Sequence, residues 1–418
     1  MKKLLAITTL ITGTLLMVSC GDDDEGTPDP MSNLGTAQEV LDSLATVLES
    51  SLITDASASG YTTATTDFAW TANLDGQSRT APTEDTVMVS ANITADATWT
   101  SDRVYQLTQR IIVTNGATLT IDAGTVIAGQ AGNEPENAAA LMIARDGTLN
   151  AVGTAQAPIV FTSTVDNGSV AVSTADVGLW GGLVVLGEAP VSADTENPQI
   201  EGVPSSETLG QYGGSTPGDN SGSLAYISIR HGGSEIFGGS EINGLTLGGV
   251  GSGTSISWIH IYANDDDGVE FFGGTVDLTN LYVEEVTDDA IDIDQSYAGT
   301  VSKFWVAVNS ASDEVLEIDG REGSLDDTFT LMEGVATAVG GASITSEFKS
   351  QAKGAISNFN SNGGLIKLVA SFASDDLTLE EDAALNAATG DLTFTTTNAT
   401  FRLDAELSDE TEISSSIN

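Results

Sequence analysis

Acidic side chains recur at a regular interval in the middle of the chain. Segments 242–247, 266–271, 288–293 and 313–318 repeat one pattern, in which a polar second residue (two polar residues in the last three segments) precedes alternating apolar and polar positions. From Leu245 to Val269, Ile291 and Leu316 the steps are 24, 22 and 25 residues. Because side chains alternate between the two faces of a strand, the apolar residues of each segment face a core and the acids between them face away from it.

Glu270, Asp292 and Glu317 would therefore form a column on the outside of stacked strands. Neighbouring strands lie about 4.8 Å apart, which puts successive carboxylates near 5 Å from one another. Protons, salt or a bound hard cation can relieve such repulsion, and calcium accepts six to eight oxygen ligands with tolerant geometry. The candidate calcium ligands are Asp266, Asp267, Glu270, Asp288, Asp289, Asp292, Asp294, Glu317 and Asp319, with Asp294 and Asp319 as a second outward file.

Two other interpretations use the same column. It can be a solvated acidic face that holds no defined ion. It can also be catalytic, because two carboxylates about 5 Å apart approximate the pair of a retaining glycosidase. Glu270, Asp292 or Glu317 would then act in a polysaccharide lyase or glycoside hydrolase, although a column that continues over several coils shows no privileged pair.

The remaining polar and aromatic candidates lie outside the column. His231 could act as a base and Arg321 could neutralise an acidic sugar, whereas His260 is expected on an ordinary polar surface. Trp180, Tyr262 and Trp305 are expected to pack or to border the coils; a flat outward row of aromatics would instead suit stacking on sugars.

The elements that must position these acids are short strands. From about residue 92 to 372, β-rich runs alternate with Gly, Asp and Asn and show no helical period. Strands at this spacing suit a sandwich or a solenoid, and the repeat of 20 to 30 residues favours the solenoid. The sequence therefore predicts an all-β fold, a right-handed, single-stranded parallel β-helix, in which each coil stacks on the last.

Several motifs along this region resemble a known group of proteins. They are Gly116-Ala117-Thr118-Leu119-Thr120-Ile121-Asp122-Ala123-Gly124-Thr125, Gly153-Thr154-Ala155-Gln156-Ala157-Pro158-Ile159-Val160-Phe161-Thr162 and Leu179-Trp180-Gly181-Gly182-Leu183. The chain is similar over roughly residues 92 to 320 to secreted and lipid-anchored β-helix proteins of Bacteroidetes and other marine bacteria. The resemblance implies the fold and no particular activity.

The charge of the chain narrows the classes of partner. Only 13 Lys and Arg face 60 Asp and Glu, a net charge of −47. Nucleic-acid binding depends on neutralising phosphates with basic residues, so it is excluded. Neutral ligands and cations remain, and an acidic polysaccharide would need a local basic pocket. The acidity also suits solubility in a saline habitat.

The N-terminus reads as an export signal. Residues 1–19 combine Lys2 and Lys3, an apolar stretch too short to span a bilayer and a small residue before Cys20, as in a cleaved lipoprotein signal. Cys20, the only cysteine, would carry the lipid. The acidic run after it resembles the tag that sends Bacteroidetes lipoproteins to the exterior of the outer membrane. The alternatives are an unpaired structural cysteine and a plain soluble linker.

Together these features predict the organisation and role of the chain. A signal peptide (1–19) precedes an acidic tether (20–35), an N-terminal helix and linker (36–91), the β-helix (92–372) and an acidic C-terminal segment (373–418). We expect a lipid-anchored outer-membrane protein without a transmembrane segment in its mature form, which binds a neutral glycan or another surface protein in adhesion. A carbohydrate-active enzyme and a structural surface-layer component are the alternatives.

Overall fold

The computed structural model describes the chain from residue 67 onward. The described ranges are 67–79, 82–132, 138–234, 240–339, 344–351, 354–357, 360–362, 366–373, 393–395, 401–407 and 410–415. The expected signal peptide, Cys20, the tether and the helix near residues 37–52 all lie outside these ranges. Among the described residues, no helix is long and apolar enough to cross a membrane.

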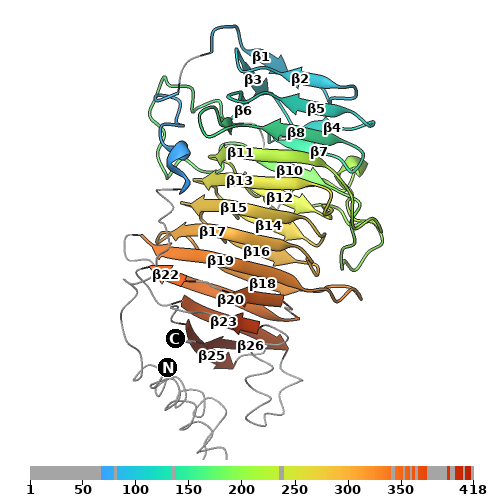
Figure 1. Cartoon of the computed structure of the whole chain (residues 1–418), viewed down its shortest axis with the longest axis vertical. Coiled ribbons are helices and arrows are strands. Elements are labelled where there is room, and N and C mark those ends of the chain that lie inside the picture. Colours follow the sequence, from blue (N-terminus) through green and yellow to red (C-terminus); the bar gives the residue numbers. More distant parts are fainter. Residues whose placement is uncertain are drawn as a thin grey trace, which may run out of the picture.

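Nearly all regular structure is β-strand, arranged in two stacked sheets (Figure 1). The 11-stranded sheet contains β4 (Ile111–Val113), β7 (Leu141–Ile143), β10 (Leu183–Leu186), β12 (Leu245–Gly248), β14 (Val269–Phe272), β16 (Ile291–Asp294), β18 (Leu316–Gly320), β20 (Ile344–Gln351), β23 (Ile366–Ala373), β25 (Phe401–Leu407) and β26 (Glu410–Ser415).

The 15-stranded sheet supplies the other sides of each coil. It contains β1 (Val87–Val89), β2 (Ala97–Trp99), β3 (Val104–Leu107), β5 (Thr118–Ile121), β6 (Val126–Gly129), β8 (Thr148–Val152), β9 (Ile159–Ser163), β11 (Gly222–Arg230), β13 (Ser255–Tyr262), β15 (Asp277–Glu284), β17 (Thr300–Val308), β19 (Phe329–Ala338), β21 (Gly354–Ser357), β22 (Asn360–Asn362) and β24 (Thr393–Thr395). The described residues also include two short 3-10 helices, η3 (Ala69–Thr71) and η5 (Thr208–Gly210).

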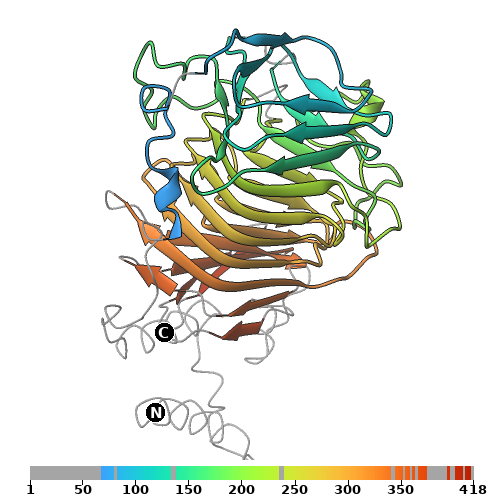
Figure 2. The same cartoon turned by 45° about the horizontal axis from the view of Figure 1, so that its top comes forward.

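A corner divides the 15-stranded sheet into two faces. The first half of β11 pairs with β8 and its second half pairs with β9. Between the halves lies Tyr226, a left-handed residue, and the same position recurs in the next coils at Trp258, Asn280, Lys303 and Glu333; φ is 51° to 60° at all five. Each coil therefore has three sides, and successive coils pair in parallel, as Figure 2 shows. The exception is β26 at the end of the stack, which pairs antiparallel with β23 and β25. These features confirm the predicted right-handed parallel β-helix.

The core lies inside the coils, where the repeat predicted it. Val269, Phe271, Ile291 and Ile293 are all at most 1% exposed, and they stack on Leu245, Leu247, Leu316 and Ile318. Burying apolar area at about 25 cal/mol per Å² is the main stabilising contribution to such a fold. The described strands run from Val87 to Ser415, so the stack extends beyond the 92–372 range that the sequence suggested.

A short segment before the first strand covers the side of the stack. We call residues 67–79 the strap; its Phe68, Trp70 and Leu74 are at most 9% exposed. It lies beside β11 to β17 in both views (Figures 1 and 2). The sequence placed these residues in a linker, but the aromatic pair Phe68 and Trp70 was a signal for packing.

Candidate functional site: a buried acid column

The three predicted acids do align across successive coils. Glu270 of β14 pairs with Asp292 of β16, which pairs with Glu317 of β18. Thr246 precedes Glu270 in the same file. All of them point away from the core because their neighbours Val269, Phe271, Ile291 and Ile293 point into it. The alternation of the strands thus places the acids in register.

The column is nevertheless not a solvated face. Glu270 is 6% exposed and Asp292 is 8% exposed, whereas Glu317 is half-buried. The interpretation as an open acidic surface is therefore wrong for Glu270 and Asp292. Strand alternation determines which way a side chain points, but it does not determine what lies over it.

A long loop covers this face of the sheet. We call residues 187–221, between β10 and β11, the cover loop. Ile200, Val203 and Tyr212 of this loop pack against Val184 and Leu186 on the outer side of β10. The Tyr212 ring lies 5.9 Å from that of Phe272, and its hydroxyl donates a 2.8 Å hydrogen bond to Gln295. The outside of this sheet is a second, smaller apolar core.

Two groups of carboxylates are close enough to share a cation. Asp267, Glu270 and Asp292 each offer an oxygen, and these oxygens lie within 4.8 Å of one another. Asp266, Asp267 and Asp288 form a second such group, so Asp267 belongs to both. The first group is buried throughout, whereas Asp288 of the second is exposed. The two groups therefore lead from the surface into the column.

Part of the acidic repeat has a structural role that links one coil to the next. The Asp267 carboxylate accepts a 3.0 Å hydrogen bond from the backbone N–H of Asp289. The Asp289 carboxylate accepts one of 2.7 Å from the N–H of Glu314, one coil further on. Asn243 stands at the equivalent place in the preceding coil and donates to Glu270. These bonds explain why an acid or amide recurs at this position.

The electrostatics of the column favour protonated carboxyls when nothing else neutralises it. Burial, followed by the charge of Asp267, raises the pKa of Glu270 well above its usual value. Burial also raises the pKa of Asp292 well above its usual value, and the charges of Glu270 and Glu317 add to this effect. Among the described residues, Asp292 Oδ1 is buried and has no hydrogen-bond partner. This oxygen is free to accept a proton or to bind a cation.

The turn acids beside the column are perturbed in the same direction. Burial raises the pKa of Asp266 to about 7, and Glu241 and Asp288 add to the effect. Burial, then a hydrogen bond with Glu317, raises the pKa of Asp289 to about 10. Desolvation disfavours the charged form and neighbouring like charges add to that cost. The region has more buried acids than one proton or one ion would satisfy.

The second predicted file, Asp294 and Asp319, is not a register pair. The pairing shifts after Ile293 and Ile318, so Asp294 stands opposite Gly320 and Asp319 is the extra residue of a bulge. An insertion of one residue reorients the side chains that follow it. Asp294 also accepts a 2.7 Å hydrogen bond from the N–H of Gln295.

The remaining candidates do not join the acids. His260 lies on β13 and His231 directly follows β11, both in the 15-stranded sheet. Both side chains are buried, so the expectation of an exposed His260 is wrong. The strap covers His260, with Trp70 edge-on to its ring. Arg321 lies 3.7 Å from Asp326 in an exposed ion pair.

The aromatic candidates pack as expected. Trp180 is 1% exposed and Trp305 is 8% exposed. The neighbouring rings of Tyr226 and Trp258 stack on each other, nearly parallel and with centroids 5.2 Å apart. Each ring therefore covers one face of the other. This pair therefore does not form a flat platform for sugar rings.

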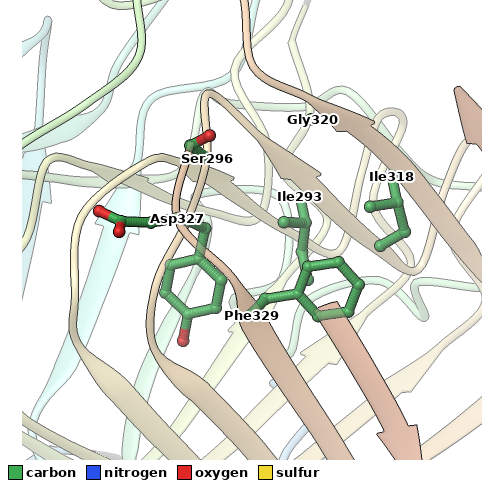
Figure 3. Close-up of a pocket in the computed structure, with 7 residues that line it drawn as sticks. Ile293, Ser296, Ile318, Gly320, Asp327 and Phe329 are labelled. Atoms are coloured by element: carbon green, nitrogen blue, oxygen red, sulfur yellow. The ribbon is translucent and has the colours of Figure 1, made fainter. Parts of the chain in front are cut away.

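A small cavity lies on the inner side of the strands that carry Asp292 and Glu317. Ile293, Ile318 and Phe329 line a cavity of about 10 Å³ together with Ser296, Tyr297, Gly320 and Asp327 (Figure 3). This volume holds about one water molecule. It is too small for a sugar ring.

A family model for a pectate-lyase-like β-helix domain matches residues 91–413. No curated protein and no solved structure matches the chain. The match covers most of the chain, and the stacked parallel coils agree with it. The chain belongs to the family of pectate-lyase-like β-helix domains.

Proposed function

We propose that this member of the pectate-lyase-like β-helix family is a non-catalytic binding protein of the cell surface, whose acid column is completed by calcium. Cys20 would carry the lipid that anchors the protein in the outer membrane, facing the exterior. The partner would be a neutral glycan or another surface protein, because the net charge of −47 repels polyanions.

The convergence of Asp267, Glu270 and Asp292 carries the calcium proposal. Their oxygens lie within 4.8 Å of one another, and all three side chains are more than 90% buried. Buried charges are normally paired or bound to a metal, and no basic side chain forms an ion pair with these three among the described residues. Calcium prefers carboxylate oxygens and tolerates irregular geometry. Asp266 and Asp288 would extend the site towards the surface.

The cover over the column supports a binding role rather than catalysis. A polysaccharide must bring its scissile bond to within hydrogen-bonding reach of a catalytic acid or base. Glu270 and Asp292 keep only 6% and 8% exposure on a sheet face whose apolar side chains pack against Ile200, Val203 and Tyr212 of the cover loop. A buried calcium would instead tie adjacent coils together and stiffen the rod that carries a binding face.

Thermal unfolding in the presence of calcium tests this proposal. Binding to the folded state alone stabilises it by about 2.7 kcal/mol at a hundredfold excess over the dissociation constant. We expect millimolar calcium to raise the Tm more than magnesium does, because magnesium demands octahedral geometry and dehydrates reluctantly. The double variant Glu270→Gln/Asp292→Asn should lose this difference and show a higher Tm without metal.

A matched control separates site binding from general charge screening. Asp194 and Glu196 are exposed acids of the cover loop, and Asp194→Asn/Glu196→Gln makes the same change in charge. This control should keep the full calcium response. Equal shifts with both metals, or an unchanged calcium response in Glu270→Gln/Asp292→Asn, would contradict the calcium site.

A carbohydrate-active enzyme is the second candidate, and membership of a pectate-lyase-like family favours it. In that case the cover loop would have to open so that Glu270, Asp292 or Glu317 reached a glycosidic bond. A screen of polysaccharides for new reducing ends and for unsaturated products, with and without calcium, distinguishes the candidates. Binding without turnover supports the first, whereas turnover that disappears in Glu270→Gln supports the second.

A further inference from the structure

The strap crosses a face of the solenoid that carries several aromatic rings. Phe68 packs against Trp258, Tyr282 and Trp305, with ring centroids 5.3 to 5.6 Å away. Trp70 lies 5.6 Å from Tyr226. The strap then turns at Asp75–Arg79, and Arg79 forms a 2.7 Å ion pair with Asp166.

Beside this turn lies a buried guanidinium that has no hydrogen-bond partner. Arg230 is 6% exposed, and its guanidinium carbon lies 4.2 Å from the centre of the Tyr262 ring. Among the described residues, its side chain donates no hydrogen bond and forms no ion pair, and its Nε is fully buried. Asp75 and Arg79 both act electrostatically on Arg230, which places the strap turn next to it.

The carboxylates near Arg230 are already occupied by other donors. Asp166 accepts hydrogen bonds from Arg79, from the N–H of Gly76 and from Thr162. Glu284 accepts from Tyr282 at 2.5 Å and lies 3.1 Å from His260 Nε2. These anions balance the charge of Arg230 but leave its five N–H donors unused. What the site lacks is acceptor atoms rather than negative charge.

An unpaired acceptor lies next to these donors. His231 Nδ1 is 2.7 Å from the carbonyl oxygen of Asp176, and a carbonyl can only accept, so Nδ1 carries the proton. Burial lowers the pKa of His231 and keeps the ring neutral, which leaves a lone pair on Nε2. That nitrogen is buried without a partner among the described residues. The His231 ring meets Tyr262 edge-on at 5.6 Å.

Unused donors and an unused acceptor around one tyrosine ring match the hydroxyl group, which both donates and accepts. We propose that Arg230, His231 and Tyr262 form a binding site for hydroxyl groups of a neutral saccharide, with the strap turn Asp75–Arg79 as its movable cover. Arg230 would donate to the sugar oxygens, and one hydroxyl would donate to His231 Nε2. An anion is disfavoured because the negative charges of Asp75, Asp166 and Glu284 already act on the guanidinium. The inference rests on the proposed glycan-binding function and assigns it a site.

Calorimetric titration of the full chain with neutral tetrasaccharides tests this site. The probes are cellotetraose, xylotetraose, mannotetraose and maltotetraose, with acetate and sulfate as anions. For the saccharide that binds, Arg230→Met should raise Kd at least tenfold, which corresponds to about 1.4 kcal/mol. His231→Asn should raise it about threefold or more, because a single hydrogen bond is lost while Asn tolerates the left-handed backbone at φ 58°.

A control and a stability measurement separate binding from folding. Arg103 is a partly exposed arginine paired with Asp102, and Arg103→Met should leave Kd unchanged. Without ligand, Arg230→Met loses the cation–π contact with Tyr262 and the positive charge that Asp166 and Glu284 balance, so its Tm should fall. Arg230→Lys keeps the positive charge but loses the planar set of donors, so it should hold its Tm better while Kd rises. If Kd in the folded Arg230→Met and Arg230→Lys variants equals that of the unchanged protein, Arg230 is only structural and the site is overturned.

The outcomes distinguish the site from the wider function. Saccharide binding that is equal in Arg230→Met and His231→Asn would overturn the site and leave the proposed function intact. Absence of binding to every neutral saccharide would overturn the site together with glycan binding, while a calcium response would still support the acid column. Binding of acetate or sulfate that depends on Arg230 would replace the saccharide with an anion.

Discussion

Burial changes the chemistry of Glu270 and Asp292, although the position of both acids on their strands follows directly from the sequence repeat. In solution their carboxyls would be ionised at neutral pH, but on this sheet face they lie beside Asp267 with Asn243 as a donor to Glu270. The structure leaves two ways to neutralise them, protons or a cation. Stability should therefore depend on both pH and calcium.

The pH dependence follows from the direction of the pKa shifts. Because the carboxyls of Glu270, Asp292 and Asp266 have raised pKa values in the folded state, that state binds more protons than the unfolded state. Without metal, their contribution to stability is complete below about pH 4 and is lost as the pH rises through the folded pKa values, which for Asp266 is about 7. Denaturant unfolding in EDTA should give a lower free energy of unfolding at pH 8 than at pH 5.

General repulsion among surface acids would also lower the free energy of unfolding at higher pH. Variants therefore decide whether the buried acids cause the effect. Glu270→Gln/Asp292→Asn should flatten the pH dependence markedly, whereas Asp194→Asn/Glu196→Gln should keep it. A free energy that rises from pH 5 to pH 8 in EDTA would refute the raised pKa values.

At the scale of elements, the strap joins coils that are far apart in the sequence. Repeat proteins are held mainly by contacts between neighbouring coils. The strap instead contacts Val160 of β9, Tyr226 of β11, Trp258 of β13, Tyr282 of β15 and Trp305 of β17. It therefore couples early and late coils into one cooperative unit.

Removing the ring that holds the strap should show this coupling. Phe68 is 2% exposed, and Phe68→Ala should cost about 3–5 kcal/mol, as for other buried phenylalanines. Hydrogen exchange should accelerate in β15 and β17, more than 200 residues away in the sequence. The exposed Met88 offers the control Met88→Ala, which should change neither quantity. Faster exchange confined to residues 67–79 would show that the strap does not support the coils.

At the scale of the whole molecule, the proposed anchor and the rod have separate tasks. The signal and Cys20 lie outside the described residues, and the tether, followed by residues 36–66, would connect them to the strap on the side of the stack. Cys20→Ser should release the protein from membranes into the soluble fraction, because acylation needs the thiol. Fractionation of cells that express this variant measures the effect. Continued membrane association would contradict the lipoprotein proposal, whereas the folded β-helix should be unaffected.

The sequence by itself determined the coil and its register. Val269, Ile291 and Leu316 recur with a period, and a side-chain alternation of two then places Glu270, Asp292 and Glu317 in one file. Both properties are local or periodic, so they can be read along the chain. The extra residue Asp319 broke the second file because a one-residue bulge leaves no mark on the apolar pattern.

Only the tertiary structure decided what covers each face. The cover loop over Glu270 and the strap over His260 bring together residues that share no period and lie far apart in the sequence. Arg230 and His231 likewise became a candidate site only when their neighbours were known. Burial depends on these long-range contacts, and burial is what makes an acidic surface a candidate cation site and leaves the donors of an arginine without partners.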